Sequence, residues 1–223
     1  MFRTTKQRLA ACATAATLAA AAASFAAPTT AAGAAAGSDL TYGSNILLQN
    51  RYGGDGGYLD TNGHSSQPGA TYNVSTNERP NSRGPATSVW KVLSATGKAA
   101  GTRVVSGDVI YLVNQYGNHT YLDTNGHSDQ TGAKYKVSAT ATKDRGPGTG
   151  KWHIFGKASS PADGHIRTDD IVHLLNDYNS ANGGFLDTNG HSSQGGGAKY
   201  SVSTSHYTDR GTGTGSWKVL PAS

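Results

Sequence analysis

Residues 59–65 read Leu-Asp-Thr-Asn-Gly-His-Ser, and the same seven residues return at 122–128 and 186–192. The three copies stand 63 and 64 residues apart. Each copy is followed by a tryptophan, at Trp90, Trp152 and Trp217. Chance does not place so many matches in one order, so internal repetition organises the chain. We therefore expect three tandem repeats, approximately 39–95, 102–157 and 164–223.

Within each repeat the apolar residues alternate with variable ones. Ile46 and Leu48 flank Leu47, and the second and third repeats place Tyr111 and His173 between the equivalent aliphatic residues. This period of two indicates a strand with one face in a core. Three more strands are expected in each repeat, ending at the leucine of Leu-Asp and covering the Tyr-x-Val and Trp-x-aliphatic pairs. Turn-forming residues fill the rest, so we predict an all-β fold.

Three repeats of four strands resemble the β-trefoil, which closes its strands about a pseudo-threefold axis. The Leu-Asp pairs at 59–60, 122–123 and 186–187 are similar to those of ricin-B-type lectin repeats, and the order Leu, Gly-x-x-Tyr, Trp is similar to MIR-type trefoils. The resemblance implies one β-trefoil domain over 39–223 whose aspartates take sugar hydroxyls. Two features depart from it, because the Gln-x-Trp motif is absent and the mature chain has no cysteine.

Residues 1–37 form a leader of different composition. Arg3, Lys6 and Arg8 precede a long alanine-rich run, as in a secretory signal peptide, and Cys12 lies inside it. Three of the 19 basic residues fall in this leader, which leaves 16 against the 14 acids. That balance makes nucleic acid an unsuitable partner, and no later apolar run has the length of a membrane span. We expect a secreted monomer without a transmembrane segment.

Hydrogen-bonding and aromatic residues recur with the repeats, although a core does not require them. The candidate ligand-binding residues are Tyr52, Asp60, Asn62, His64 and Gln67 in the first repeat, Tyr116, Asp123, Asn125, His127 and Gln130 in the second, and Tyr178, Asp187, Asn189, His191 and Gln194 in the third. Carboxylates and imidazoles suit sugar hydroxyls, and a phenol ring suits the apolar face of a pyranose.

Each candidate also has a purely structural interpretation. Asn-Gly favours a hairpin turn, which we place ahead of ligand contact for the asparagines, and an aspartate can close an Asx-turn. A histidine can be a solvated loop residue, or three can meet around one Zn²⁺. The tyrosines can anchor loops. Arg83, Arg145 and Arg210 can be solvated, or can grip an anionic sugar.

The pattern gives poor support for catalysis. No acid differs between the copies in a way that would create an acid–base pair, and no Ser-His-Asp context belongs to one repeat alone. The Asp-x-Asn-Gly fragment lacks the ligands that begin and end an EF-hand loop. We therefore expect no enzyme activity, no cofactor and no resident metal.

The leading hypothesis is a secreted carbohydrate-binding protein with up to three similar sites for polysaccharide or cell-surface glycan. The alternative is a secreted inhibitor of a protease or another protein. Its loop 77–88 holds Pro80 and Pro85, which would stiffen a loop presenting Arg79 or Arg83. A third interpretation makes the polar triplets scaffold, with the function in partner contacts that the sequence does not show.

Overall fold

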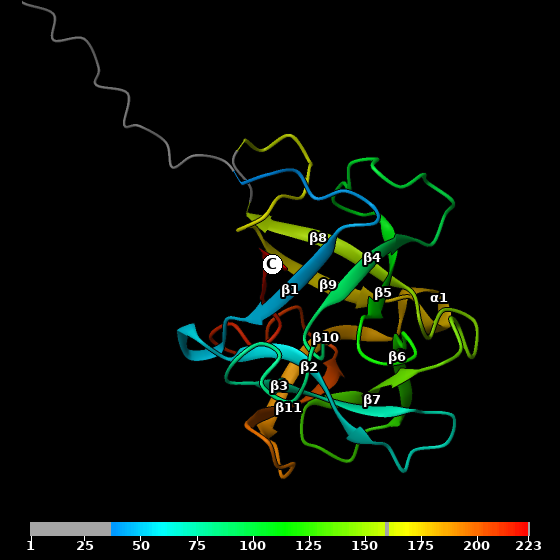
Figure 1. Cartoon of the computed structure of the whole chain (residues 1–223), viewed down its shortest axis with the longest axis vertical. Helices are drawn as coiled ribbons and strands as arrows, with labels where there is room; N and C mark the ends of the chain where they lie inside the picture. Colours follow the sequence, from blue (N-terminus) through cyan, green and yellow to red (C-terminus); the bar gives the residue numbers. More distant parts are fainter. Residues whose placement is uncertain (1–36, 159–160, 223) are drawn as a thin grey trace, which may run out of the picture. The chain divides into compact units, whose positions relative to one another are not determined.

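Twelve strands and two short helical turns make up the described residues, 37–158 and 161–222, of the computed structural model (Figure 1). The strands are β1 (Asn45–Asn50), β2 (Gly57–His64), β3 (Tyr72–Asn77), β4 (Trp90–Ser94), β5 (Val109–Asn114), β6 (Tyr121–His127), β7 (Ala133–Thr140), β8 (Trp152–Ala158), β9 (Ile171–Asn176), β10 (Gly184–His191), β11 (Ala198–Ser205) and β12 (Trp217–Pro221). A 3-10 turn, Tyr52–Gly54, follows β1, and α1, Tyr178–Ala181, follows β9.

The alternating residues build the core as predicted. In β1, Ile46 and Leu48 are buried while Leu47 and Gln49 are partly exposed. The three tryptophans are fully buried, and each donates its indole N–H to the carbonyl of the leucine in the Leu-Asp pair. In the first repeat the distance from Trp90 Nε1 to the Leu59 oxygen is 2.9 Å. This bond gives the indole N–H an acceptor inside the core, so the tryptophan ring can be buried without contact to solvent.

The strand pairings close into a ring. β1 pairs with β12, β12 with β9, β9 with β8, β8 with β5, β5 with β4, and β4 with β1, all antiparallel. The remaining hairpins, β2–β3, β6–β7 and β10–β11, extend from this ring (Figure 1). Their inner strands β3, β7 and β11 pair with one another. Closure satisfies the edges that an open sheet would expose.

This arrangement corrects the predicted fold class. The expectation was a β-trefoil of three four-strand repeats, but the twelve strands form one sheet closed as an antiparallel barrel. Strands of different repeats are direct neighbours, since β4 pairs with β5 and β8 with β9. The physical reason is that each repeat leaves the edges of its first and last strands unpaired, and these edges are filled by the adjacent repeat. The all-β prediction itself is confirmed.

The repeated Asn-Gly does not form the predicted hairpin turn. β2 continues through Asp60, Asn62 and Gly63 to His64, and the pairing with β3 shifts between Asn62 and His64. Gly63 has φ +53, so glycine supplies the left-handed conformation that this bulge requires. The chain reverses later, between His64 and Tyr72. The same shift occurs in β6 and β10.

The described residues include the predicted single domain but almost none of the predicted leader. The leader predicted over 1–37 lies outside them except for Gly37. The described part belongs to one compact unit, Ala35–Ser223. Within 37–158 and 161–222, no helix has the length and apolar character needed to cross a bilayer.

Candidate functional site

The aspartates of the repeated Leu-Asp pair lie inside the protein. Asp60, Asp123 and Asp187 are fully buried, and each forms an ion pair with an arginine of its own repeat. In the third repeat, Arg210 donates from Nη2 and Nε to Asp187 Oδ1 at 2.6 and 2.9 Å. Burial raises the pKa of each aspartate, against the opposing effect of its hydrogen-bond donors and the arginine charge. The carboxylates are therefore framework groups, which corrects their assignment as ligand-binding residues.

The first of these ion pairs differs from the other two. Ser88 Oγ donates to Asp60 Oδ2 at 2.5 Å, whereas the Oδ2 atoms of Asp123 and Asp187 are buried without a hydrogen-bond partner among the described residues. Gly150 and Gly215 occupy the position of Ser88. A Cβ on Gly150 would lie 2.2 Å from the carbonyl oxygen of Lys143, so no larger residue fits there. The second and third pairs are thus less completely satisfied than the first.

Above each ion pair lies a group of three aromatic rings. In the third repeat, the His191 ring lies 5.1 Å from Tyr200, and Tyr200 meets Tyr52 edge to face at 5.3 Å. His127, Tyr135 and Tyr178 form the second group, with separations of 4.9 and 5.5 Å. His64, Tyr72 and Tyr116 form the first, at 5.2 and 5.6 Å. We call these the third, second and first clefts, after the repeat that supplies the histidine.

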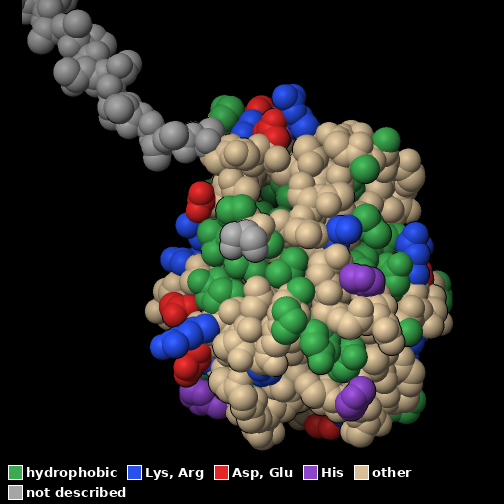
Figure 2. All heavy atoms as spheres, viewed as in Figure 1, with side chains coloured by type: hydrophobic (Ala, Val, Ile, Leu, Met, Phe, Trp, Pro, Cys, Tyr) green, Lys and Arg blue, Asp and Glu red, His purple; other side chains and the backbone are tan. Residues whose placement is uncertain are grey.

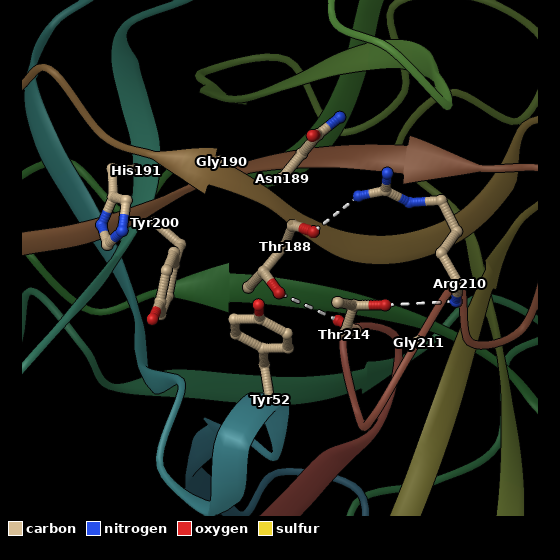
Figure 3. Close-up of a pocket in the computed structure, with 9 residues that line it drawn as sticks. All are labelled: Tyr52, Thr188, Asn189, Gly190, His191, Tyr200, Arg210, Gly211 and Thr214. Atoms are coloured by element: carbon tan, nitrogen blue, oxygen red, sulfur yellow. Dashed lines mark hydrogen bonds between the residues drawn. The ribbon is translucent and has the colours of Figure 1, made fainter.

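Two of the clefts contain measurable cavities. The third cleft encloses about 370 Å³ and the second about 250 Å³. Figure 3 shows Tyr52, Tyr200 and His191 on one side of the third cleft and Arg210 on the other, with Thr188 between them. The third cleft is lined by Tyr52, Thr188, Asn189, Gly190, His191, Tyr200, Arg210, Gly211 and Thr214. The second is lined by the equivalent Thr124, Asn125, Gly126, His127, Tyr135, Arg145, Gly146, Thr149 and Tyr178.

Each cleft is assembled from two repeats. Tyr52 belongs to the first repeat but lines the third cleft, and Tyr178 belongs to the third repeat but lines the second cleft. The sequence grouped Tyr52 with His64, because they are close along the chain. The structure instead groups Tyr52 with His191, because barrel closure brings β1 beside the last repeat. The predicted tyrosines and histidines are thus brought together, but in a different combination.

The loop beside the first cleft differs from its counterpart beside the third. Gly84 follows Arg83 in the loop above it, and a Cβ on Gly84 would lie 3.6 Å from Cε2 of Tyr116. A Cβ on the equivalent Gly211 would have no atom within 4 Å. Arg83 also turns toward the carbonyl of Gly196, to which its Nε donates at 3.0 Å. The loop at Gly84 therefore approaches the cleft tyrosine more closely than the equivalent loop at Gly211 does.

The predicted asparagines and glutamines have separate roles. Asn62 and Asn125 are buried and donate to Ser75 and Ser138 in the neighbouring strand. Asn125 and Asn189 donate to equivalent carbonyls of the preceding repeat, those of Pro68 and Thr131. Asn125 and Asn189 line clefts. Gln67, Gln130 and Gln194 do not join their clefts but line a different cavity. Their grouping with the histidines is therefore corrected.

Sequence reasoning missed two elements of the clefts. Tyr72, Tyr135 and Tyr200 were assigned to core strands, because each stands two residues before a buried valine; in the structure they are partly exposed at the strand end. The second element is a buried asparagine before each cleft tyrosine. Asn50 Oδ1 accepts from the backbone N–H of Tyr52 at 3.0 Å, and its Nδ2 donates to the Thr214 carbonyl at 2.8 Å. The repeated Asn-x-Tyr spacing was the available signal.

The structure bears on two alternatives that the sequence left open, a protease-inhibitor loop and a metal site shared by three histidines. Arg83 has 10% of its side-chain surface exposed and is bound to Asp60, so it is not presented to a protease. Arg79 is exposed in the same loop, and the inhibitor hypothesis depends on it alone. His64, His127 and His191 lie in three different clefts, and the described residues contain no cluster of metal-ligating side chains that joins them.

Comparisons with known proteins support the architecture alone. Neither a protein-family model nor a curated protein matches this chain. Among solved structures, the SDF2-like protein from Arabidopsis thaliana aligns with a TM-score of 0.60 at 18% identity, covering 82% of this chain and 94% of that one. A Caenorhabditis elegans protein of unknown function gives 0.62 at 17% identity, covering 82% and 96%.

The protein O-mannosyltransferase Pmt1-Pmt2 complex of S. cerevisiae, bound to the sugar donor, gives a TM-score of 0.63 at 18% identity. The match covers 83% of this chain and 25% of that one. At such identities the likeness shows the fold. It corrects the β-trefoil resemblance drawn from the sequence, to ricin-B-type and MIR-type trefoil lectins, because what is shared is a closed antiparallel barrel.

Proposed function

We propose that this chain is a secreted, non-enzymatic protein that binds neutral carbohydrate in the aromatic clefts between its repeats. The observation that carries the proposal is the threefold recurrence of a His–Tyr–Tyr group at the seams between repeats, open in at least the second and third clefts. Binding sites commonly combine apolar rings with a few polar groups in this way.

The chemistry of the third cleft suits a pyranose. The Tyr52 and Tyr200 rings offer apolar surface to the C–H face of a sugar. His191 and Asn189 carry donors and acceptors for hydroxyl groups. Tyr52 is 38% exposed, so its ring is accessible to a polymer arriving from solvent.

The charge state of the clefts favours a neutral sugar over an anionic one. The guanidinium of Arg210 lines the third cleft but is neutralised by Asp187, and its Nη1 donates to the Thr131 carbonyl at 3.3 Å. On the face seen in Figure 2, basic and acidic side chains lie beside one another at the edges, without a broad patch of either sign. An anionic sugar would therefore find no unpaired guanidinium in this cleft.

Binding without hydrolysis is favoured by the position of the acids. Glycoside hydrolysis requires two carboxyl groups that flank the scissile bond. The residues that line the second and third clefts include no aspartate or glutamate. Asp123 and Asp187 are buried and paired with the lining arginines, and Asp144 and Asp209 accept hydrogen bonds from the lining residues Thr149 and Thr214. Equivalent clefts on one chain also favour multivalent capture of a repeating polymer, because the second contact forms at high effective concentration.

The test is capture by insoluble polysaccharides followed by elution and quantification. Wild-type protein is compared with Tyr52→Ala/Tyr116→Ala/Tyr178→Ala, which removes one ring from every cleft. The matched control is Tyr207→Ala, because Tyr207 is 69% exposed and lines neither the second nor the third cleft. We expect the triple variant to lose retention and the control to keep it. Equal retention of all three proteins, or of none, would refute the proposal.

Export is part of the proposal and has its own measurement. The leader over 1–37 is expected to be removed, leaving a monomeric domain in the medium. Mass spectrometry of the protein recovered from culture medium should give an N-terminus between residues 23 and 38. Recovery of the intact leader from the cell fraction alone would contradict secretion.

A further inference from the structure

The turn that follows the Asn-x-Tyr tyrosine of each cleft differs in length among the three clefts. At the third cleft, five residues separate Tyr52 from Tyr58. At the second cleft, six residues separate Tyr178 from Phe185, whereas the turn at the first cleft, 117–120, has four. A longer turn has more conformations available, so holding its tyrosine in one position costs more entropy. The turns at the second and third clefts therefore require more stabilisation than the turn at the first.

The turn at the second cleft is also strained. Asn179, Ser180 and Ala181 have φ values of +54, +59 and +60, and this left-handed conformation is unfavourable for residues that carry a Cβ. The turn at the third cleft places Gly53 and Gly54 at positive φ instead, where glycine has no such cost. A strained turn persists when the surrounding structure holds it. Contacts from outside the turn must therefore stabilise the one at the second cleft.

A lysine of the neighbouring repeat makes such a contact at the second cleft. Lys134 lies in β7, and its Nζ donates to the backbone carbonyl and to Oδ1 of Asn182, the latter at 2.7 Å. Asn182 in turn donates its backbone N–H to the carbonyl of Tyr178 at 3.0 Å. The ammonium of Lys134 also lies 5.7 Å from the ring centroid of the next residue, Tyr135. One side chain thus connects the strand and the turn that carry the two facing tyrosines.

The third cleft has the equivalent connection. Lys199 lies in β11, donates to the backbone carbonyl of Asp55 at 2.5 Å and stands 3.8 Å from its carboxylate. Asp55 directly follows the turn Tyr52–Gly54. The Lys199 ammonium lies 5.9 Å from the Tyr200 ring centroid. In the first repeat Thr71 occupies this position, opposite the shortest turn. The lysine is thus present at the two longer turns and absent at the short one.

We propose that Lys134 and Lys199 are positioning residues, which hold the facing tyrosines of the second and third clefts in contact before a ligand arrives. Each lysine joins two repeats across a seam and fixes the edge-to-face ring pair that lies there. Binding groups that are fixed in advance lose less freedom when the ligand binds, which raises affinity. The effect on affinity rests on the proposed carbohydrate binding, whereas the positioning of the rings does not.

The ligand-free protein tests the positioning. Lys134→Met keeps the aliphatic side chain and removes the hydrogen-bond donor, and nuclear Overhauser effects between the ring protons of Tyr135 and Tyr178 report the contact. We expect this variant to lose those effects and to keep the corresponding ones at the third cleft, and Lys199→Met to do the reverse. An intact contact between Tyr135 and Tyr178 in Lys134→Met would overturn the proposal.

Two further variants separate positioning from a general loss of structure. Lys136→Met is the matched control, because Lys136 lies in the same strand, pairs with Asp129 and does not line the second cleft. It should keep the ring contact. Lys134→Met should keep the urea midpoint of the wild type, since interactions of exposed lysines contribute little to global stability. Lys134→Arg should restore the ring contact, because a guanidinium can donate to the same oxygens. Failure to restore it would contradict hydrogen-bond donation as the cause.

A titration separates this proposal from the proposed function. With an oligosaccharide that shifts the His127 ring of the wild type, Lys134→Met should raise the dissociation constant at the second cleft about fivefold, as expected for the cost of ordering one flexible group. The constant at the third cleft, reported by His191, should not change. Equal constants at the second cleft in variant and wild type would refute the positioning role. If no oligosaccharide shifts His127 in the wild type, carbohydrate binding there is refuted, and the ligand-free ring contact still decides the role of Lys134.

Discussion

Tyr52 and Tyr200 meet edge to face, with ring centroids 5.3 Å apart, although one belongs to the first repeat and the other to the last. The contact exists because β1 pairs with β12 and closes the barrel. Tyr135 and Tyr178, and Tyr72 and Tyr116, make the equivalent contacts at the other two seams. The candidate ligand sites are thus products of closure, and no repeat contains a complete one.

Replacing Tyr52 by alanine is expected to weaken ligand binding in the third cleft and to leave binding in the first cleft unchanged. The variant should lower affinity at the third cleft about tenfold, the factor supplied by an aromatic contact of about 1.4 kcal/mol. Ring signals of His191 and His64 report the two clefts separately during a glycan titration. A reduced response at His64, with His191 unaffected, would contradict the assembly of clefts between repeats.

Asn50 is expected to position Tyr52 while remaining outside the ligand contact. Asn50→Ala removes the acceptor of the Tyr52 N–H and the donor to Thr214, leaving buried groups unsatisfied at a cost of about 1–3 kcal/mol. Urea denaturation should show this loss, and the third cleft should bind more weakly. Gln49→Ala, one residue earlier and partly exposed, serves as control. Full stability and full affinity in Asn50→Ala would refute this role.

Removing Arg210 should lower the free energy of unfolding far more than its partly exposed position suggests. Arg210→Ala leaves the carboxylate of Asp187 fully buried without its cation, and breaking a buried pair costs about 3–5 kcal/mol. The double variant Arg210→Met/Asp187→Leu should recover part of that loss, since no charge is left unpaired. Chemical denaturation measures both. A single variant that loses less than about 1 kcal/mol would show that the pair is not a framework element.

Ser88 should matter in the first repeat because it completes the hydrogen bonding of Asp60. Ser88→Ala removes a bond to a charged oxygen at 2.5 Å and is expected to cost about 1.5–3 kcal/mol. Ser82→Ala, an exposed serine in the same loop, is expected to be neutral. Thermal unfolding of the two variants separates them; equal melting temperatures would mean that Asp60 finds another donor.

Part of this architecture follows from the sequence and part does not. The alternation around Leu48 and the Trp-x-aliphatic pairs predicted buried strands, and those strands are present. The Asn-Gly at 62–63 was misassigned because a hairpin turn and a bulge both require a residue with positive φ, which Gly63 supplies. Composition cannot distinguish a hairpin turn from a bulge. Only the continued pairing of β2 with β3 shows that a bulge is present.

The aspartates show a different limit. An aspartate and an arginine recur 22 or 23 residues apart in all three repeats, as at Asp60 and Arg83, so their pairing was visible as a co-repetition. Their burial depends on packing that residue type does not indicate. The combination of Tyr52 with His191 depends on strand order, which the repeats alone leave open. The residues of the clefts were therefore largely predictable, and their partners were not.

The most direct test of carbohydrate binding is an aromatic-ring NMR titration with oligosaccharides released from a polysaccharide that retains the wild-type protein. Binding in the clefts should shift the ring signals of Tyr52, Tyr200 and His191, and of Tyr178, Tyr135 and His127. These shifts should disappear when Tyr52 and Tyr178 are replaced by alanine. Retention of the polymer with these six rings unmoved would contradict binding in the clefts.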